Sequence, residues 1–295
     1  MKRIFSLALF LVLLFSLCLS LSACSVAVIY NDAEKYTPGN AEIQAKINRL
    51  DIEWISGKVN ISYHDSDEIH CKEIGNRELK AHEMLHWFVD GTTLRVRFSE
   101  SGKWRFGNLE KELEIKLPKS TNLFEVDVET VSADVTAESI NAIKLSFDTV
   151  SGNVALNALK IADSIEIHTV SGDSEITLSK ELMRLNVEST SGNLKVIAPC
   201  ITACNIETVS GDSSFNFEKA PSYFDAESTS GNFKLTIPES SSFKLSFESA
   251  SGDFNSEIEA TKQGEFYISG DGKATYEFET ASGNLNLYKY EQVEK

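Results

Sequence analysis

The sequence has no excess of basic residues. Lys and Arg number 28 and Asp and Glu number 44, so the formal charge is −16 over 295 residues. Proteins that bind nucleic acid need a basic footprint, and so do proteins that dock broadly on anionic lipid. The charge therefore argues against nucleic acid as a partner and against an anionic lipid surface as the docking site.

The common catalytic signatures are missing. The sequence contains no G-x-S-x-G elbow, no phosphate-binding loop and no dinucleotide fingerprint. Parallel β-helices include polysaccharide-degrading enzymes, but such sites need carboxylates that break a regular pattern, and no convincing cluster of this kind stands out. We expect no enzymatic activity, no catalytic residue and no cofactor, and keep a polysaccharide-acting enzyme as the less favoured alternative.

Cysteine is scarce. Of five cysteines, Cys18 and Cys24 lie near the N-terminus, which leaves Cys71, Cys200 and Cys204. An odd number excludes complete intramolecular pairing, so no disulfide framework is expected. Cys200-x-x-x-Cys204 supplies half a zinc site at best, and we expect no metal site there.

Only one long apolar run is present. It covers residues 4–21 after a basic start and ends in Leu21-Ser22-Ala23-Cys24, which is typical of a secretory signal, although its length approaches the ~18 residues of a membrane-spanning helix. Small residues before a cysteine resemble the bacterial lipobox. That resemblance implies cleavage after Ala23, lipidation of Cys24 and a membrane anchor at the N-terminus. The cleaved chain would carry 26 − 44 = −18 charges.

The rest of the chain divides into three expected regions. Residues 24–45 predict a polar spacer, with a turn at Pro38-Gly39-Asn40 and an optional short helix over 41–50. Residues 46–125 predict an irregular N-terminal β region that contains a hairpin and caps the remainder. Residues 126–290 predict a repeat domain.

An internal repeat is the strongest signal in the sequence. Copies of Ser-Gly-Asn/Asp occur at 151–153, 171–173, 191–193, 210–212, 230–232, 251–253 and 282–284, with a degenerate copy at 132–134. Successive glycines are 19 to 21 residues apart except for the last step, which is 31. Leu145, Phe147 and Thr149 alternate with polar residues before the turn, and alternation resumes after it, so each copy predicts two short strands around a tight bend.

Two arrangements satisfy this pattern: a series of antiparallel hairpins, or a parallel β-solenoid of ~20-residue coils, each stacked on the last. Stacked coils bring equivalent side chains to within ~4.8 Å of each other, so equivalent positions should be chemically alike. We call the residues at one equivalent position of successive copies a file. One file consists of small hydroxyl residues: Thr130, Thr149, Thr169, Ser189, Thr208, Ser228, Ser249 and Thr280. Another file is apolar: Val128, Phe147, Ile167, Val187, Ile206, Ala226, Phe247 and Phe278. We therefore predict an all-β fold, a parallel β-solenoid of about eight coils.

Two further files carry charge. The residue after Ser-Gly alternates between Asn and Asp from Asn153 to Asp253, which spaces the carboxylates at ~10 Å, beyond the ~8 Å screening length. A neighbouring file is acidic throughout except for one histidine (Glu129, Asp148, His168, Glu188, Glu207, Glu227, Glu248, Glu279). We interpret it as a solvated face that discourages aggregation, with a weak divalent-cation ladder as the alternative.

His82-Glu83-Met84-Leu85-His86 fits the H-E-x-x-H zinc motif, which functions only on a helix. Here the alternation of Leu85, Trp87 and Val89 toward Asp90-Gly91 predicts a β-hairpin, and strand residues four apart lie ~13 Å from each other. We expect no zinc chemistry at this motif, and we interpret His64 and His70 as ordinary surface residues.

The array of Ser-Gly-Asp/Asn units, together with the related unit Leu50–Ile61, resembles a bacterial "putative adhesin" family, a DUF4097-like β-repeat domain, over residues 47–288. The resemblance implies a β-solenoid-like fold and a place in the cell envelope, on the cell membrane or outer membrane, and it implies no catalytic residues. We predict a lipoprotein whose acidic β-solenoid binds an envelope protein or glycan. The alternative is an envelope-stress or regulatory accessory lipoprotein.

Overall fold

The computed structural model describes residues 29–103 and 108–291. The expected signal peptide and Cys24 lie outside the described residues. The regular secondary structure of the described chain is nearly all β-strand, and the chain divides into two compact units between Ala155 and Leu156. In these described ranges no helix has the length and hydropathy needed to cross a membrane.

The first unit contains two short 3₁₀ helices and nine strands, and β10 (Val154–Ser171) begins at its end. The elements are η1 (Ala33–Lys35), β1 (Thr37–Pro38), β2 (Ala41–Ile43), β3 (Arg49–His64), β4 (Ile69–Gly75), η2 (Ala81–Glu83), β5 (His86–Asp90), β6 (Thr93–Arg97), β7 (Lys111–Pro118), β8 (Leu123–Glu138) and β9 (Asn141–Ser151).

Parallel pairing builds the coils of this unit. β3 is parallel to β8 from Arg49 to Ile61, and β8 is in turn parallel to β9. On its other side, the first half of β3 pairs with β6 and the second half with β7, again in parallel. Residues 46–125, expected as an irregular cap, therefore include coils of the same kind as the repeat.

Antiparallel strands cover the outer edge of the β6/β7 coil. β5 pairs with β6 and β4 with β7, and β1 and β2 extend these pairs. Part of the expected spacer is folded, because β1 and β2 belong to this layer. Tyr36, which lies between η1 and β1, is buried. The optional helix over 41–50 is wrong: residues 41–43 form β2, 44–48 are a connection, and β3 begins at Arg49 with alternating apolar residues that fit a half-buried sheet.

The second unit consists of parallel coils closed by a hairpin. Its strands are β11 (Ser174–Leu178), β12 (Leu182–Ser191), β13 (Leu194–Ala198), β14 (Ile201–Ser210), β15 (Ser213–Phe217), β16 (Tyr223–Ser230), β17 (Phe233–Ile237), β18 (Phe243–Ser251), β19 (Phe254–Ser256), β20 (Thr261–Gln263), β21 (Phe266–Ser269), β22 (Ala274–Ser282) and β23 (Leu285–Lys289). β10, β12, β14 and β16 pair in parallel in that order on one side of each turn, and β11, β13, β15 and β17 on the other. The parallel β-solenoid is confirmed, and the antiparallel alternative is wrong.

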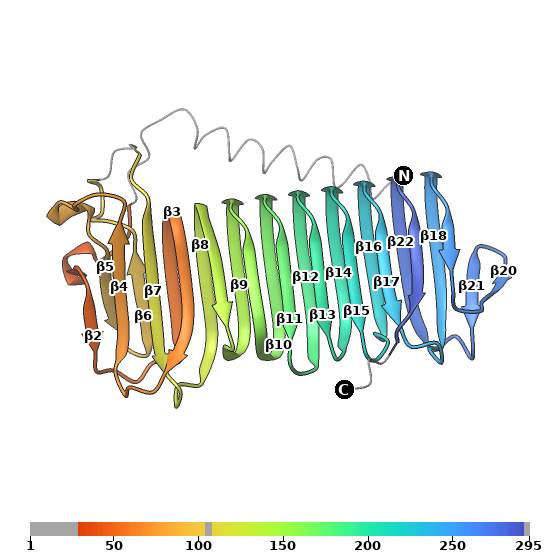
Figure 1. Cartoon of the computed structure of the whole chain (residues 1–295), viewed down its shortest axis with the longest axis horizontal. Helices are drawn as coiled ribbons and strands as arrows, with labels where there is room; N and C mark the ends of the chain where they lie inside the picture. The colour runs from red at the N-terminus through yellow and green to blue at the C-terminus, as the bar shows by residue number, and fades with distance from the viewer. Residues whose placement is uncertain (1–28, 104–107, 292–295) are drawn as a thin grey trace. The chain divides into compact units, whose positions relative to one another are not determined.

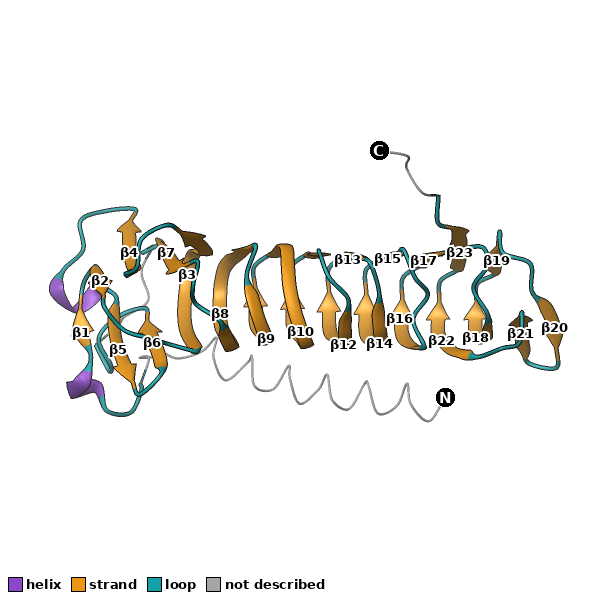
Figure 2. Ribbon diagram, turned by 90° about the horizontal axis from the view of Figure 1, so that it is seen from below, coloured by secondary structure: helices purple, strands orange, loops and turns teal. Residues whose placement is uncertain are grey.

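The order of the last coils differs from the sequence order. β16 and β17 pair with β22 and β23, and these pair on their other side with β18 and β19. The last coil along the chain is therefore inserted between its two predecessors, as Figures 1 and 2 show. The 31-residue step between the last two glycines is long because β20 and β21 fold back over β18 before the chain returns.

Aromatic rings hold the inserted coil in place. Phe278 stacks on Phe224 at a ring separation of 5.1 Å and meets Phe233 edge-on at 5.5 Å. On the other side, Tyr276 stacks on Phe243 at 5.4 Å. All five side chains are buried, and such pairs add about 0.5–1.5 kcal/mol each beyond their area burial.

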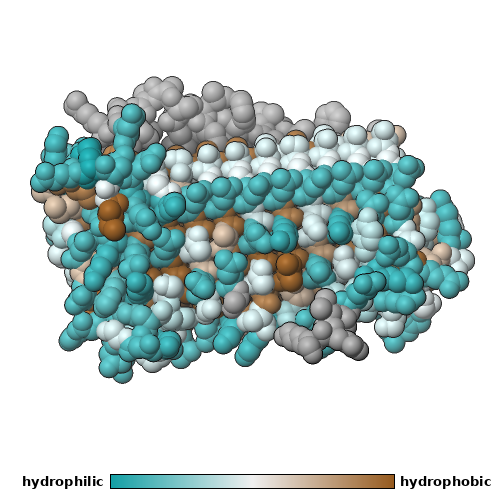
Figure 3. Space-filling model, in the orientation of Figure 1, coloured by the Kyte–Doolittle hydropathy of each residue, from teal (hydrophilic) through white to brown (hydrophobic). Residues whose placement is uncertain are grey.

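The Ser-Gly turns bring successive backbones into close approach. Gly192 has a φ of +129°, and a Cβ atom at this position would lie 2.0 Å from the carbonyl oxygen of Gly172. Any side chain would therefore prevent the coils from stacking, which explains why the turn repeats glycine. In the space-filling view, rows of near-neutral and hydrophilic residues run along the edge where these turns lie (Figure 3).

Hydrogen bonds connect the residue after each turn glycine with the equivalent residue of the next coil. The Oδ1 atom of Asp173 accepts from the backbone N–H of Asn193 at 2.7 Å and from its side-chain amide at 3.1 Å. Asp212 accepts in the same way from Asn232. Asn193 accepts in turn from the backbone N–H of Asp212 at 3.1 Å.

The inserted coil changes the alternation of Asn and Asp at this position without bringing two aspartates together. Asn284 lies between Asn232 and Asp253, donating its N–H to the first and accepting from the second. The order in the second unit is therefore Asp, Asn, Asp, Asn, Asn, Asp, and each carboxylate has only asparagines beside it in this file.

Two matched substitutions test this order. Asn193→Asp places a carboxylate between Asp173 and Asp212, whereas Asn232→Asp places one beside Asp212 alone. Each adjacent pair repels by ~0.9 kcal/mol at ~4.8 Å in water, and both variants lose the same side-chain donation. We expect Asn193→Asp to lower the free energy of unfolding by about 0.9 kcal/mol more than Asn232→Asp, which is the repulsion of one additional aspartate neighbour, with this difference shrinking in 1 M salt.

Urea unfolding of the two variants at low and high salt measures this difference. If the coils followed sequence order, Asn232→Asp would also gain two aspartate neighbours. Equal destabilisation by the two variants would therefore contradict the inserted coil.

Candidate functional site: the acidic face

In the second unit, five glutamates occupy one register position on adjacent coils. The pairs Glu188 with Glu207, Glu207 with Glu227, Glu227 with Glu279 and Glu279 with Glu248 are all in parallel register, and His168 precedes them. We call these five glutamates the glutamate file. It lies on the side of the turns formed by β12, β14, β16, β22 and β18, and it contains no Lys or Arg.

The glutamate file is electrostatically costly to fold. Four of its five side chains are half-buried, and burial together with the neighbouring Glu188 raises the pKa of Glu207. The residues that follow each Ser-Gly, which we call the asparagine–aspartate file, avoid adjacent carboxylates, whereas the glutamate file places carboxylates on consecutive coils. Repulsion between carboxylates is therefore relieved in the asparagine–aspartate file and retained in the glutamate file.

The file does not converge on a point. Among residues 29–103 and 108–291, the one group of three or more His, Cys, Asp or Glu ligand atoms lying within 4.8 Å of one another is Glu42, Glu68 and His70, in the first unit. Because hard cations need several oxygens around one centre, the glutamate file is arranged as a line of charge and not as a chelating cluster. This arrangement disfavours the divalent-cation ladder.

The first unit carries a second acidic group at the equivalent positions. Glu53, Glu129 and Asp148 are in register on β3, β8 and β9, and Asp51 is in register with Asp127 beside them. Two arginines on β6 lie at the end of this group, in register with Asp51 and Glu53.

Arg97 and Arg95 partly neutralise this acidic group. Arg97 is buried and contacts Asp51 at 2.6 Å and Glu53 at 3.1 Å, and Arg95 contacts Asp51 at 2.8 Å. Even so, burial is the largest cause that raises the pKa of Asp127, to about 6, followed by the charges of Glu129, Asp51, Asp148 and Glu125. Sequence alternation identified the file but could not show where arginines would meet it.

The H-E-x-x-H residues are used structurally. His82 lies on the short helix η2 and His86 begins β5, where it is buried with Nδ1 2.9 Å from the Met84 carbonyl oxygen. Both carboxylate oxygens of Glu83 accept from Arg77 at 2.8 Å, which lowers the pKa of Glu83 to about 2. A carboxylate held in this way is a poor general base. The predicted hairpin is confirmed, with β5 and β6 joined at Asp90-Gly91.

A buried ion pair in the first unit had no signal in the sequence. The Nζ atom of Lys111 lies 2.6 Å from Glu73 Oε2, with both side chains almost fully buried, and it also donates to the Glu83 and Phe98 carbonyl oxygens. It faces the Trp54 and Phe98 rings, and burial lowers its pKa to about 8. Since no part of this side chain reaches solvent, its role is structural.

The three cysteines of the described part are free thiols. Cys71 and Cys204 are buried and Cys200 is half-buried. Burial raises the pKa of Cys71 to about 12 and raises that of Cys204 well above the usual value. These thiols therefore stay protonated, which makes them poor nucleophiles and poor metal ligands.

Asp127 gives the first unit a defined pH dependence. Because its pKa is raised on folding, the folded state holds more protons than the unfolded state between about pH 4 and pH 6, so this group makes stability fall as the pH rises through that window. Asp127→Asn removes the penalty. The full shift corresponds to about 3 kcal/mol, and solvent screening of a half-exposed side chain reduces the expected gain at pH 7.5 to about 1 kcal/mol.

Thermal unfolding at pH 4 and pH 7.5 measures this effect, with Asp67→Asn, an exposed aspartate of the same unit, as the control. Asp127→Asn should stabilise at pH 7.5 and be near neutral at pH 4. Destabilisation at pH 7.5, or an equal gain from Asp67→Asn, would contradict the assigned electrostatics.

Comparison with known proteins assigns the chain to a family. The model of the family Toastrack DUF4097 matches residues 47–288, and the chain belongs to this family. No match was found among curated proteins. A "putative adhesin" from Bacteroides fragilis is 15% identical with a TM-score of 0.50, covering 86% of this chain and 97% of its own. A "putative lipid binding protein" from Parabacteroides distasonis is 15% identical with a TM-score of 0.50, covering 88% and 98%. At this identity, the two structures support the fold.

Proposed function

We propose that this member of the Toastrack family is a lipid-anchored protein of the bacterial cell envelope that binds a cationic partner through the glutamate file. The partner class is an envelope protein with a basic surface or a glycan that carries amines. The Bacteroides fragilis structure of the same fold, described as a "putative adhesin", agrees with a binding role.

The observation that carries this proposal is the contrast between the two charged files. The same coils that separate their aspartates by asparagines place glutamates on consecutive coils, where each adjacent pair costs up to ~0.9 kcal/mol in water. A surface that only needed solubility could carry lysine or glutamine at alternate positions. A line of like charge instead favours long cationic partners, because opposite charge spread along a line steers and orients them.

The anchor half of the proposal rests on the sequence. The apolar run and Leu21-Ser22-Ala23-Cys24 place the lipidated residue five positions before the first described residue, Ile29. Five residues span at most ~17 Å, so a lipid on Cys24 would hold the first unit close to the membrane surface.

The binding half is tested with a triple variant of the glutamate file, Glu188→Gln, Glu207→Gln and Glu227→Gln. The matched control changes three exposed glutamates of the same unit outside the file, Glu218→Gln, Glu259→Gln and Glu265→Gln. Both variants lose three charges, so only position differs. Binding of the full chain to chitosan oligomers and to a lysine-rich peptide is measured by interferometry at physiological salt.

We expect the file variant to bind at least one of the two probes about tenfold more weakly, since the loss of three ion pairs with the probe at about 0.5 kcal/mol each gives this factor. The control should stay within twofold of the native chain. Equal weakening in both variants, or no binding of either probe by the native chain, would overturn the proposed role of the file.

The anchor is tested by Cys24→Ser in a bacterial host. The native chain should incorporate labelled fatty acid and partition into the detergent phase, whereas Cys24→Ser should do neither, because the thiol is the acceptor of the lipid. Cys18→Ser serves as the control and should behave like the native chain. Incorporation of label into Cys24→Ser would exclude this residue as the anchor.

A further inference from the structure

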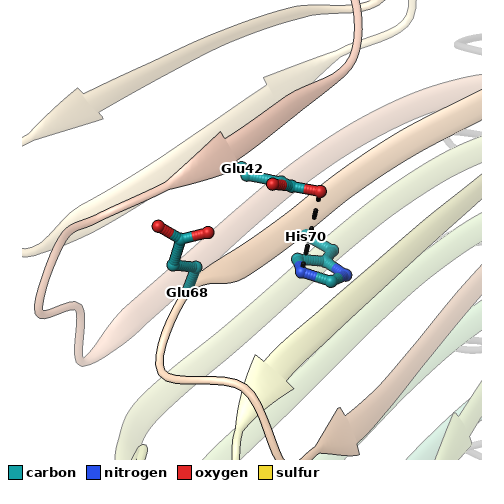
Figure 4. Close-up of side chains that lie close together, drawn as sticks. All are labelled: Glu42, Glu68 and His70. Atoms are coloured by element: carbon teal, nitrogen blue, oxygen red, sulfur yellow. Dashed lines mark ion pairs between the residues drawn. The ribbon is translucent and has the colours of Figure 1, made fainter.

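A second candidate site lies in the antiparallel layer of the first unit and includes no residue of either charged file. Glu42 on β2 and His70 on β4 are directly opposite each other in the β2–β4 ladder, and Glu68 lies in the bend just before β4, two residues before His70. Figure 4 shows the three side chains facing one another. Their ligand atoms all lie within 4.8 Å of one another.

We propose that Glu42, Glu68 and His70 bind a divalent transition metal, with zinc as the best match. One imidazole nitrogen and two carboxylates form a mixed set of donors that suits zinc better than calcium or magnesium, which prefer oxygen ligands alone. Three protein ligands leave one position of a tetrahedral zinc open to solvent or to a group from a partner.

The distances are compatible with this metal after small side-chain rotations. His70 Nε2 lies 4.0 Å from Glu42 Oε1, whereas ligand atoms about 2.1 Å from a tetrahedral zinc lie roughly 3.4 Å from one another. Closing this difference needs rotation of the exposed Glu42 and the half-buried Glu68 carboxylates and no movement of the strands, because the register of β2 and β4 already fixes the positions of Glu42 and His70.

Neighbouring contacts orient the ligands. The His64 ring packs edge-on against His70 at 4.3 Å between centroids, and His64 Nε2 lies 2.8 Å from the Glu68 carbonyl oxygen. His64 therefore links the backbone of one ligand to the ring of another, which limits the freedom that metal binding would otherwise have to remove.

The competing contacts are weak enough to be displaced. Lys72 lies 3.4 Å from Glu42 Oε1, in a pair whose side chains are 43% and 54% exposed. Gln44 donates to Glu68 Oε1 at 2.5 Å on the surface. Exposed pairs of this kind contribute little, so a divalent charge can replace Lys72 beside Glu42. The side chain of His70 is 22% exposed, which leaves the site accessible from solvent.

The full chain, purified in detergent and stripped with a chelator, is titrated with zinc by calorimetry. The variants His70→Gln and Glu42→Gln remove one ligand each. The matched controls are His82→Gln and Glu78→Gln, a histidine and an exposed glutamate of the same unit that lie outside the cluster. The melting temperature of each metal-free variant shows whether it is folded.

We expect the native chain and both controls to bind one zinc ion per chain at this site, and each ligand variant to bind it at least tenfold more weakly with an unchanged metal-free melting temperature. X-ray absorption of the zinc complex should show nitrogen and oxygen ligands without sulfur. The absence of saturable binding, undiminished binding in His70→Gln, or sulfur ligands, which would move the metal to the cysteines, would overturn the proposal. These outcomes are independent of the glutamate file, so the two proposals can fail separately.

Discussion

The structure depends on the close approach of successive backbones at the Ser-Gly turn. At Gly192 the carbonyl oxygen of the preceding coil occupies the space that a Cβ atom would need. This contact sets the coils in register, and register in turn places like residues beside like residues: isoleucine beside valine in the core, threonine beside serine under the turn, and glutamate beside glutamate outside. The two charged files of the second unit follow from that constraint, because parallel stacking repeats the type of residue that a position carries.

Such repetition is favourable for apolar and neutral groups and unfavourable for charges. The charged positions of this chain show three different arrangements. The aspartates after the turn accept hydrogen bonds from the next coil and are separated by asparagines that keep the same bonds without charge. The glutamates before the turn have no such spacing. In the first unit, the equivalent acidic group ends at Arg97 and Arg95. In the glutamate file, stacking therefore conflicts with electrostatics, and conflict of this kind is expected at functional sites.

Much of this was readable from the sequence, because repetition converts a short motif into a strong pattern. The alternation of apolar and polar residues, together with the turn residues, predicted the files that contain Phe147 and Thr149 and the parallel solenoid. The same pattern predicted the hairpin at Asp90-Gly91. The pattern did not predict the order of the last coils, because Phe278 and Phe247 occupy equivalent positions and either coil could follow β16 by pattern alone. The contacts of Phe278 with Phe224 and Phe233 that secure the inserted coil are tertiary. The pairing of Lys111 with Glu73, and the cluster at His70, likewise depend on strands whose pairing no local pattern specifies.

In-register stacking with an inserted last coil can be measured directly through methyl groups. Ile176 and Val196 are in register on neighbouring coils, and so are Leu235 and Leu287, all four buried. In protein with labelled Ile, Leu and Val methyl groups, nuclear Overhauser contacts should connect Ile176 with Val196 and Leu235 with Leu287. If the second contact were missing while the first was present, the inserted coil would be wrong. If both were missing, the stacked solenoid itself would be contradicted.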